Sequence, residues 1–473
     1  MKIVAPNTSR LVEGLRDTGY TFNAAIADLV DNSIAAEADV IQVSVDLDRN
    51  QRVRVRIADD GVGMDRAGLE NAMMYGSKEQ VSANSLSKFG MGLKTASTAF
   101  CRRVSLISQS EGSSDSAIHY ATWDLDLLTQ KDEWWLDEGP AESSHEDEFF
   151  DAMETLKFYG STRAAASGTV VLWEKVDRLL KTKQGKDPSK PRKFVDDMVN
   201  LLKFHLALVY QRYLDPLDER ARNVRIYIND ERVVAWDPFC TNWVQPVDAD
   251  GKKVWRLQGP SGDEWQIVCR SYILPSANEV EDPKYKAAAR ISNQRQGIYL
   301  YREERLIEGP SWLGLVGTAE THMNNLRIEL SFPGELDEVF GVGIKKSGVH
   351  LDEHFAEALD KHLAPIRREA QNVARQGSAR RAAASGEGTA RPSERTIAST
   401  IQSLDIPVIQ GMNDGSVVLT GNEGDVTIVD ASGRSTGHIS IVVEDEAQPV
   451  YVQKKETLDL GVLWEPTYIT QKG

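Results

Sequence analysis

Two hydrophobic periodicities alternate along the first 175 residues. Residues 23–37 place apolar side chains three and four positions apart, as on one side of a helix. Residues 40–47 and 52–57 alternate apolar with polar side chains around a polar turn, which predicts a β-hairpin. By the same criteria, further helices are predicted at residues 66–74 and 92–99, and further strands at residues 104–108, 118–124 and 169–173. This alternation predicts an α+β fold, an α/β sandwich built on a mixed sheet.

The pattern changes after this region and predicts further units. A long apolar-periodic helix is expected at residues 194–213 and another at residues 352–374, and strands are expected at residues 224–228, 265–273, 297–302 and 327–332. Residues 376–398 are rich in Gly, Ser, Ala and Arg, and residues 417–468 are strand-rich with turn sequences between the strands. We therefore predict four segments: an N-terminal domain (1–176), a second α/β domain (177–375), a flexible linker (376–398) and a small β-rich module (399–473).

Composition narrows the class of protein. The chain has 473 residues, of which 41% are hydrophobic, enough for more than one packed core. No apolar run approaches the roughly 18 residues of a membrane helix, and the N-terminus lacks the apolar core of a signal peptide, so no membrane contact and a cytoplasmic location are expected. Cys101, Cys240 and Cys269 are far apart in sequence, which predicts buried thiols rather than disulfides or a zinc knuckle.

Charge is unevenly distributed. The formal net charge of −16 argues against coating nucleic acid by bulk charge. Residues 137–154 hold eight acidic and no basic residues, which suits a solvated loop. The lysine-rich residues 178–193 are interpreted as a flexible connection, and residues 367–395 hold seven arginines and are interpreted as a helix end that continues into the linker. If DNA is a partner, these two basic stretches would contact it with steep salt dependence.

One predicted helix carries two polar residues suited to nucleotide chemistry. Asp28 and Asn32 are four positions apart on the helix at 23–37, so they share a neighbouring face. The amide oxygen of Asn32 suits Mg²⁺, which prefers oxygen ligands. Asp28 could orient or deprotonate a water that attacks a γ-phosphate. The alternative is a helix whose acidic residues merely face solvent.

Two glycine-containing turns offer the remaining parts of a nucleotide site. Asp59 ends a predicted strand and is followed by Gly61 and Gly63, which let a ligand or backbone approach closely. The turn at residues 90–92 opens a helix, so its amides form an anion site to which Lys94 adds positive charge. Each turn alone is common, as an Asp-Gly turn or a glycine turn before a helix. The ordered combination within 67 residues is not common and predicts an ATP site.

These three segments resemble the GHKL ATPases, which include the DNA gyrase B proteins, the Hsp90 chaperones, the MutL proteins and histidine kinases. The resemblance implies a Bergerat fold, with Asp28 and Asn32 in its N-box, the segment around Asp59 as its adenine-binding turn, and residues 90–92 as the hinge of an ATP lid. The segment at residues 25–33 and Lys94 look most like the MORC and MutL branches. Those branches typically have Glu at the position of Asp28, so slow turnover is expected, and Asp31 ranks second as a base.

The resemblance also implies a set of site residues. The predicted nucleotide contacts are Asn32 (also the Mg²⁺ ligand), Asp59, Gly61, Gly63, Met64, Gly76, Ser77, Lys88, Phe89, Gly90, Met91, Gly92, Leu93, Lys94 and Thr169. Residues 297–307 are similar to the sheet of a transducer (ribosomal S5-like) domain, in which a loop lysine reaches the γ-phosphate. Lys345 or Lys346 is the candidate, with Asp28 as the other catalytic residue. The alternative is a surface hairpin with two solvated lysines.

The resulting hypothesis is an ATP- and Mg²⁺-dependent ATPase that acts as an ATP-gated homodimeric clamp. Its relatives imply work in DNA transactions, DNA repair or anti-phage defence, with effector proteins as partners. The competing hypothesis is a nucleotide-regulated scaffold that binds partner proteins without hydrolysing ATP. His350, His354 and His362 fall at helix-like spacing but have no cysteine nearby in sequence, so they are interpreted as solvated or capping residues.

Overall fold

The protein is described here by a computed structural model. The described residues are 7–17, 19–75, 86, 92–112, 117–164, 166–179, 191–258, 263–276, 279–316, 321–337, 339–341, 351–384, 425–429, 435–442, 449–455 and 469–470. The chain divides into two compact units. The first comprises Met1–Arg290, Arg295–Leu315 and Leu326–Ile366, and the second comprises Ile291–Gln294, Val316–Asn325 and Arg367–Gly473. All the site residues considered below belong to the first unit.

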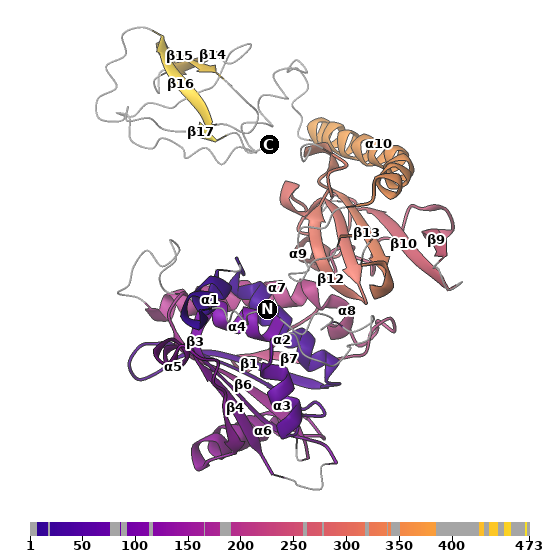
Figure 1. The fold of residues 1–473 in the computed structure, drawn as a ribbon. Coiled ribbons are helices and arrows are strands. Elements are labelled where there is room, and N and C mark those ends of the chain that lie inside the picture. Colours follow the sequence, from indigo (N-terminus) through magenta and orange to yellow (C-terminus); the bar gives the residue numbers. More distant parts are fainter. Residues whose placement is uncertain are drawn as a thin grey trace, which may run out of the picture. The chain divides into compact units, whose positions relative to one another are not determined.

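The first unit contains an eight-stranded sheet (Figure 1). In their order across the sheet, the strands are β5 (Asp137–Pro140), β4 (His119–Asp124), β3 (Cys101–Gln109), β6 (Gly168–Val176), β2 (Val53–Asp59), β1 (Val40–Leu47), β7 (Arg225–Ile228) and β8 (Glu231–Arg232). Neighbouring strands are antiparallel except β1 and β7, which are parallel. Asp59 lies opposite Ile41 on one side and Thr169 on the other, so the end of β2 is held within the sheet.

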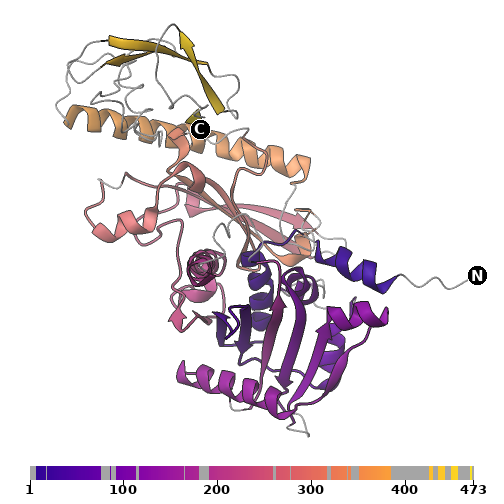
Figure 2. The ribbon, with the colours of Figure 1, turned by 90° about the vertical axis from the view of Figure 1, so that its left-hand side faces the viewer.

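Helices cover both faces of this sheet (Figure 2). The described helices of this unit are α1 (Thr8–Arg16), α2 (Phe22–Ala35), α3 (Arg66–Met73), α4 (Gly92–Phe100), α5 (Leu125–Lys131), α6 (Ser143–Phe158), α7 (Pro191–Val209), α8 (Gln211–Leu214), α9 (Pro283–Ala289) and the first part of α10 (Glu353–Ala384), up to Ile366. On β6, Val170 and Leu172 pack with α6, whereas Trp173 stacks on Phe100 and meets Phe22 edge-on. Successive strand residues point to opposite faces, so α6 covers one face and α2 with α4 the other.

The composition of residues 137–154 predicted a solvated loop, and this prediction is wrong. The stretch forms β5 and most of α6. Phe149, Ala152, Met153 and Leu156 follow the spacing of one helical face and are buried against the sheet. The acidic residues occupy the remaining positions of the helix. The composition therefore did not reveal an amphipathic helix, because the acidic side chains and the buried apolar side chains lie on different faces of α6.

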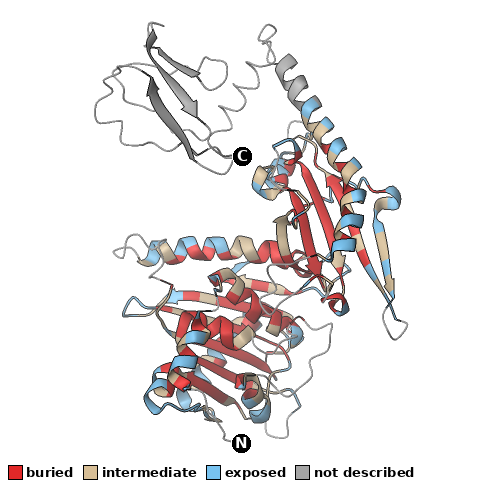
Figure 3. Ribbon diagram, turned by 45° about the horizontal axis from the view of Figure 1, so that its top comes forward, coloured by how far each residue is buried: buried red, intermediate tan, exposed pale blue. Residues whose placement is uncertain are grey.

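The first sheet extends beyond the boundary predicted at residue 176. Strand β7 begins at Arg225 and pairs with β1 from Val40 to Val43. Helix α7 therefore belongs to a crossover connection that returns the chain to the same sheet, and it does not open a separate domain. Figure 3 shows buried strands in this sheet and helices with exposed outer faces.

A five-stranded sheet follows in the same unit. In order across the sheet, its strands are β12 (Arg305–Ser311), β11 (Gly297–Arg302), β13 (Leu326–Phe332), β10 (Glu264–Ile273) and β9 (Lys253–Gln258). Helix α10 continues to Ala384, past the predicted helix end at residue 374 and into the stretch predicted as a linker. The alanines and arginines there favour helix.

The C-terminal region has four described strands in one sheet, in the order β14 (Asp425–Val429), β15 (Ser435–Val442), β16 (Pro449–Lys455) and β17 (Ile469–Thr470). They lie within the stretch predicted to be rich in strands and just after it. Among the described residues, no helix is both long and apolar enough to span a membrane.

Candidate functional site

Helix α2 carries the first part of the site. The Thr21 hydroxyl caps the helix by accepting a hydrogen bond from the Ala24 amide, and the apolar face of the helix packs on the sheet. Asp28 is 5% exposed, and Asn32, one turn later, is half-buried. The Tyr20 hydroxyl donates a hydrogen bond to Asp28 Oδ2 at 2.7 Å. The Asp28 carboxylate is thus held in one orientation.

Arg305 links the second sheet to the acidic residues of α2. Its Nε donates to Asp31 Oδ1 at 3.1 Å, and its Nη2 lies 3.9 Å from Asp28 Oδ1. The Tyr210 hydroxyl also donates to Asp31 Oδ1, at 2.7 Å. Burial disfavours the charge on Arg305, but Asp31, Tyr210 and Asp28 outweigh it and raise the pKa of the guanidinium above its ordinary value. Asp31 is fully buried in this network.

The sequence interpretation did not assign a role to Arg305 or Tyr210. Arg305 lies 274 positions from Asp31, and no local pattern links the two. A single arginine at the start of a strand gives no periodic signal. The sequence offered one sign of such a partner. Asp31 lies on a largely apolar helix, and a carboxylate that such a helix buries needs a cation to neutralise it.

Asp59 is the second part of the site and lies at the end of β2. It is 5% exposed, and its Oδ2 accepts a hydrogen bond from the Ser33 hydroxyl at 2.8 Å. Its Oδ1 accepts from the Gly61 amide at 3.1 Å. Burial raises the pKa of Asp59 to about 6, although the bonds from Ser33 and Gly61 act in the opposite direction. Asp59 is therefore a desolvated carboxylate that stays ionised at neutral pH.

Thr169 and Met64 are brought to the same end of the sheet. Thr169 lies opposite Asp59 in the β2–β6 register. The hydroxyl oxygens of Ser108 and Thr169 are 2.9 Å apart, and Ser108 Oγ accepts from the Met64 amide at 2.8 Å. Ser108 was not predicted, and it connects the turn after β2 to strand β6. Three of the predicted contacts, Asp59, Met64 and Thr169, thus belong to one hydrogen-bonded region.

The glycines after Asp59 are required by close backbone packing. A Cβ atom on Gly61 would lie 2.6 Å from the carbonyl oxygen of Ala36. Gly63 has φ +66°, and a Cβ there would lie 1.9 Å from the carbonyl oxygen of Gln109. Any other residue would clash at both positions and would be strained at Gly63. Glycine at these positions therefore allows the turn to pack closely against the neighbouring backbone. The absence of a side chain would also let a ligand approach closely.

Lys94 does not have the environment that was expected for it. The sequence analysis placed its charge at the glycine turn before α4. In the structure the side chain is buried, and its Nζ donates to the carbonyl oxygens of Ala72 at 2.9 Å and Met74 at 2.6 Å. Burial lowers the pKa of Lys94 to about 8. Lys94 thus satisfies carbonyls at the C-terminal end of α3.

The first turn of α4 lies beside Asp28. A Cβ built on Gly92 would be 3.5 Å from Asp28 Oδ2, and Leu93 is half-buried next to it. The remaining predicted contacts lie outside the described residues, namely Gly76, Ser77, Lys88, Phe89, Gly90, Met91, Lys345 and Lys346. The lid contacts and the transducer lysine therefore stay predictions.

The residues present fit a nucleotide and its metal ion. An ionised carboxylate offers about four lone-pair positions. Asp59 accepts one hydrogen bond on each oxygen from Ser33 and Gly61, which leaves capacity for an adenine amino group. The side-chain oxygen of Asn32 is a suitable ligand for Mg²⁺. Asp28 lies one turn earlier on the same helix.

Solved structures of other proteins are similar to this chain. Two of the similar solved structures are the following. One is described as the N-terminal domain of a DNA repair protein, at 16% identity and TM-score 0.41, covering 77% of this chain and 98% of that one. The other is the B-subunit of the DNA gyrase from Myxococcus xanthus, at 10% identity and TM-score 0.39, covering 76% and 95%. A search of curated proteins finds no match.

The family comparison covers the part of the chain that holds most of the site. The matched segment begins at Tyr20, which donates to Asp28, and contains α2, β2 and α4, whereas Thr169 lies outside it. The mixed α+β architecture with one large sheet is consistent with such a domain. The match suggests ATP binding and ATPase activity. Residues 20–157 match the family of histidine kinase-, DNA gyrase B- and HSP90-like ATPases.

Proposed function

We propose that the protein binds ATP with Mg²⁺ and hydrolyses it. The observation that carries this proposal is the buried, ionised Asp59 at the end of β2, with spare acceptor capacity beside a glycine turn, inside the segment that matches the ATPase family. A buried carboxylate costs stability, so its retention is best explained by a ligand that donates to it. The amino group of adenine is that donor in this proposal.

Asp28 is the proposed water-orienting base. Its rival on the same helix, Asp31, is fully buried and is bound by Tyr210 and Arg305, which makes it a structural anion. Asp28 lies on the side of α2 that meets Gly92, where the phosphate turn is predicted. Tyr20 and Arg305 hold Asp28 in place, and electrostatic positioning of this kind is a main contribution to phosphoryl transfer.

Mg²⁺, when bound, would neutralise developing phosphate charge. Asn32 is its proposed protein ligand, and few protein ligands are expected because Mg²⁺ keeps several waters. Lys345 or Lys346 is proposed to contact the γ-phosphate, as the resemblance implies. If turnover proves negligible while ATP still binds, the nucleotide-regulated scaffold becomes the better description.

Replacing Asp59 with Asn is expected to weaken ATP binding about tenfold or more. A hydrogen bond to a charged group contributes about 1.5–3 kcal/mol, and about 1.4 kcal/mol is a tenfold change in affinity. Isothermal titration calorimetry at pH 7.5 measures the change. Burial favours the protonated form of Asp59 in the folded protein. The stability that this protonated form contributes is full below the unfolded pKa of 3.8, and it is lost as the pH rises through about 6. D59N should therefore melt at the wild-type temperature or above it at pH 7.5.

The ratio of wild-type to D59N affinity isolates the titration of Asp59, because the ATP phosphates titrate equally in both measurements. This ratio should fall as the pH is lowered through about 6, where Asp59 becomes protonated and loses acceptor capacity. Equal affinity of the two proteins at pH 7.5, with D59N fully folded, would contradict the adenine role.

We further propose that ATP binding closes two copies of the chain into a clamp. This clamp would act in DNA transactions or defence, together with effector proteins. Such a change requires contacts to ATP that only the closed state makes. The full chain with Mg²⁺ and a non-hydrolysable ATP analogue should elute at twice its monomer mass in size-exclusion chromatography with light scattering, and at the monomer mass with ADP. D59N is the matched control and should stay monomeric at an analogue concentration that saturates only the wild type. A wild-type protein that stays monomeric under every nucleotide condition would contradict the clamp proposal.

A further inference from the structure

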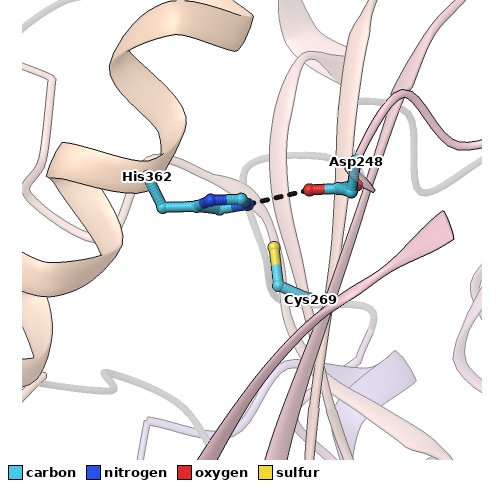
Figure 4. Close-up of side chains that lie close together, drawn as sticks. All are labelled: Asp248, Cys269 and His362. Atoms are coloured by element: carbon cyan, nitrogen blue, oxygen red, sulfur yellow. Dashed lines mark hydrogen bonds and ion pairs between the residues drawn. The ribbon is translucent and has the colours of Figure 1, made fainter. Parts of the chain in front are cut away.

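Three side chains with metal-binding atoms converge at the second sheet. Asp248 precedes β9, Cys269 lies on β10, and His362 lies on α10. One ligand atom from each lies within 4.8 Å of the others, and Figure 4 shows the three side chains pointing toward one another. His362 Nε2 is 2.8 Å from Asp248 Oδ1. These residues take no part in the nucleotide site proposed above.

We propose that this cluster binds one Zn²⁺ ion through Cys269 Sγ, His362 Nε2 and an oxygen of Asp248. Thiolate, imidazole and carboxylate are the three side-chain ligand types that zinc takes in proteins. The thiolate distinguishes the site from one for Mg²⁺ or Ca²⁺, which prefer oxygen. His362 is about one-fifth exposed, so a water can complete a tetrahedral set at the solvent side.

The charges of the cluster favour a divalent cation. Asp248 is 7% exposed, and Cys269 is fully buried. With Zn²⁺, one thiolate and one carboxylate balance the two positive charges of the metal. A buried cluster of zero net charge then replaces a buried carboxylate.

The three ligand atoms lie within 4.8 Å of one another, so metal binding needs them both to draw together and to adopt tetrahedral spacing. Zinc bonds of about 2.0–2.3 Å place tetrahedral ligand atoms roughly 3.3–3.6 Å apart. The Asp248 and His362 atoms must therefore separate by about half an ångström, a shift that side-chain rotation can provide. The Ser271 amide donates to Asp248 Oδ2, and its hydroxyl donates to Oδ1 at 3.3 Å. Such partners fix the orientation of a ligating carboxylate.

The site would fasten α10 to the five-stranded sheet. His362 supplies the ligand from α10, whereas Cys269 lies in the middle of β10, opposite Leu330 of β13 and Lys253 of β9. The ring of Trp255 meets the His362 imidazole edge-on at 5.6 Å and covers one side of the cluster. Metal binding is then expected to raise the stability of this part of the molecule, because the folded state binds zinc in place and the unfolded chain does not.

Cobalt substitution and metal analysis test the proposal directly. The full chain, freed of any affinity tag, is dialysed against a chelator and then titrated with Co²⁺ or Zn²⁺ alone. The expected results are one bound metal per chain, a thiolate-to-cobalt absorption band in the near ultraviolet, visible bands of tetrahedral intensity, and a higher melting temperature with zinc. C269S should lose the thiolate band, and H362Q should weaken metal binding at least tenfold.

Two matched variants serve as controls. His354→Ala removes an exposed histidine of the same helix, and Cys240→Ser removes a buried thiol outside the cluster; both should bind metal like the wild type. The wild-type titration does not depend on any variant folding. No stoichiometric metal binding by the wild type, or a cobalt spectrum without a thiolate band, would show that Asp248 and His362 form only a hydrogen-bonded pair.

Discussion

Asp28→Asn is expected to slow ATP hydrolysis about a hundredfold or more while ATP affinity stays within a few-fold of wild type. General-base catalysis typically contributes 10²–10⁴-fold, and asparagine cannot take a proton from water. Its side-chain oxygen can still accept the hydrogen bond from Tyr20, so the local structure should persist. Phosphate release at saturating ATP measures the rate, and calorimetry measures the affinity.

Asp28→Glu is the matched control for this experiment. Glutamate keeps the carboxylate and adds one methylene. It is the residue typical of the families that the sequence resembles. Gly92 has no side chain beside Asp28, which leaves space for that methylene. D28E is expected to hydrolyse ATP at the wild-type rate or faster. Turnover by D28N at the wild-type rate would rule out Asp28 as the base.

Arg305→Met is expected to lower the free energy of unfolding by about 3–5 kcal/mol. Removing one partner of a buried ion pair leaves the other charge uncompensated, and Asp31 is fully buried. Methionine fills similar volume, so little of the loss should come from a cavity. The Asp28 carboxylate also loses its cation at 3.9 Å, and turnover per folded molecule should fall. Urea denaturation followed by circular dichroism measures the stability, and phosphate release below the unfolding transition measures the turnover.

Arg302 provides a control from the preceding strand. Arg302 Nε donates to Asp337 Oδ1 at 2.6 Å, and both side chains are buried. Arg302→Met breaks a buried pair of the same kind, whose acidic partner, Asp337, lies outside α2. It should destabilise the fold to a similar extent with turnover per folded molecule unchanged. If both variants slow turnover equally, the effect of Arg305 is a general loss of stability and not a specific contact with the site.

The elements near the proposed nucleotide site were largely predictable from the sequence. The helix at 23–37 and the hairpin after it were predicted to within two residues at most of their ends, because their periodicities are strong and local. Asp59 and Thr169 were both named, and the register of β2 and β6 places them opposite each other. The glycines after Asp59 were predicted as a turn, and their clashes with Ala36 and Gln109 give the reason.

Other features depended on contacts that local sequence does not encode. Helix α6 was predicted as a loop because acidic residues dominate its composition, although its buried face is regular. Lys94 was placed at the phosphate turn, yet its amine binds carbonyls at the end of α3. His362 was interpreted as a solvated or capping histidine, because Cys269 is near it only in the folded chain.

The sequence alone determined the ordered set of polar residues and glycines that indicates ATP binding, and the helices and strands that carry them. These depend on spacings of a few residues, which the backbone converts directly into shared faces and turns. Only the tertiary structure decided which charges are paired. Arg305 neutralises Asp31 across 274 residues, β7 joins the first sheet, and Asp248 meets His362. Such pairings come from the packing of whole elements, because a buried charge must find its partner wherever the fold brings one.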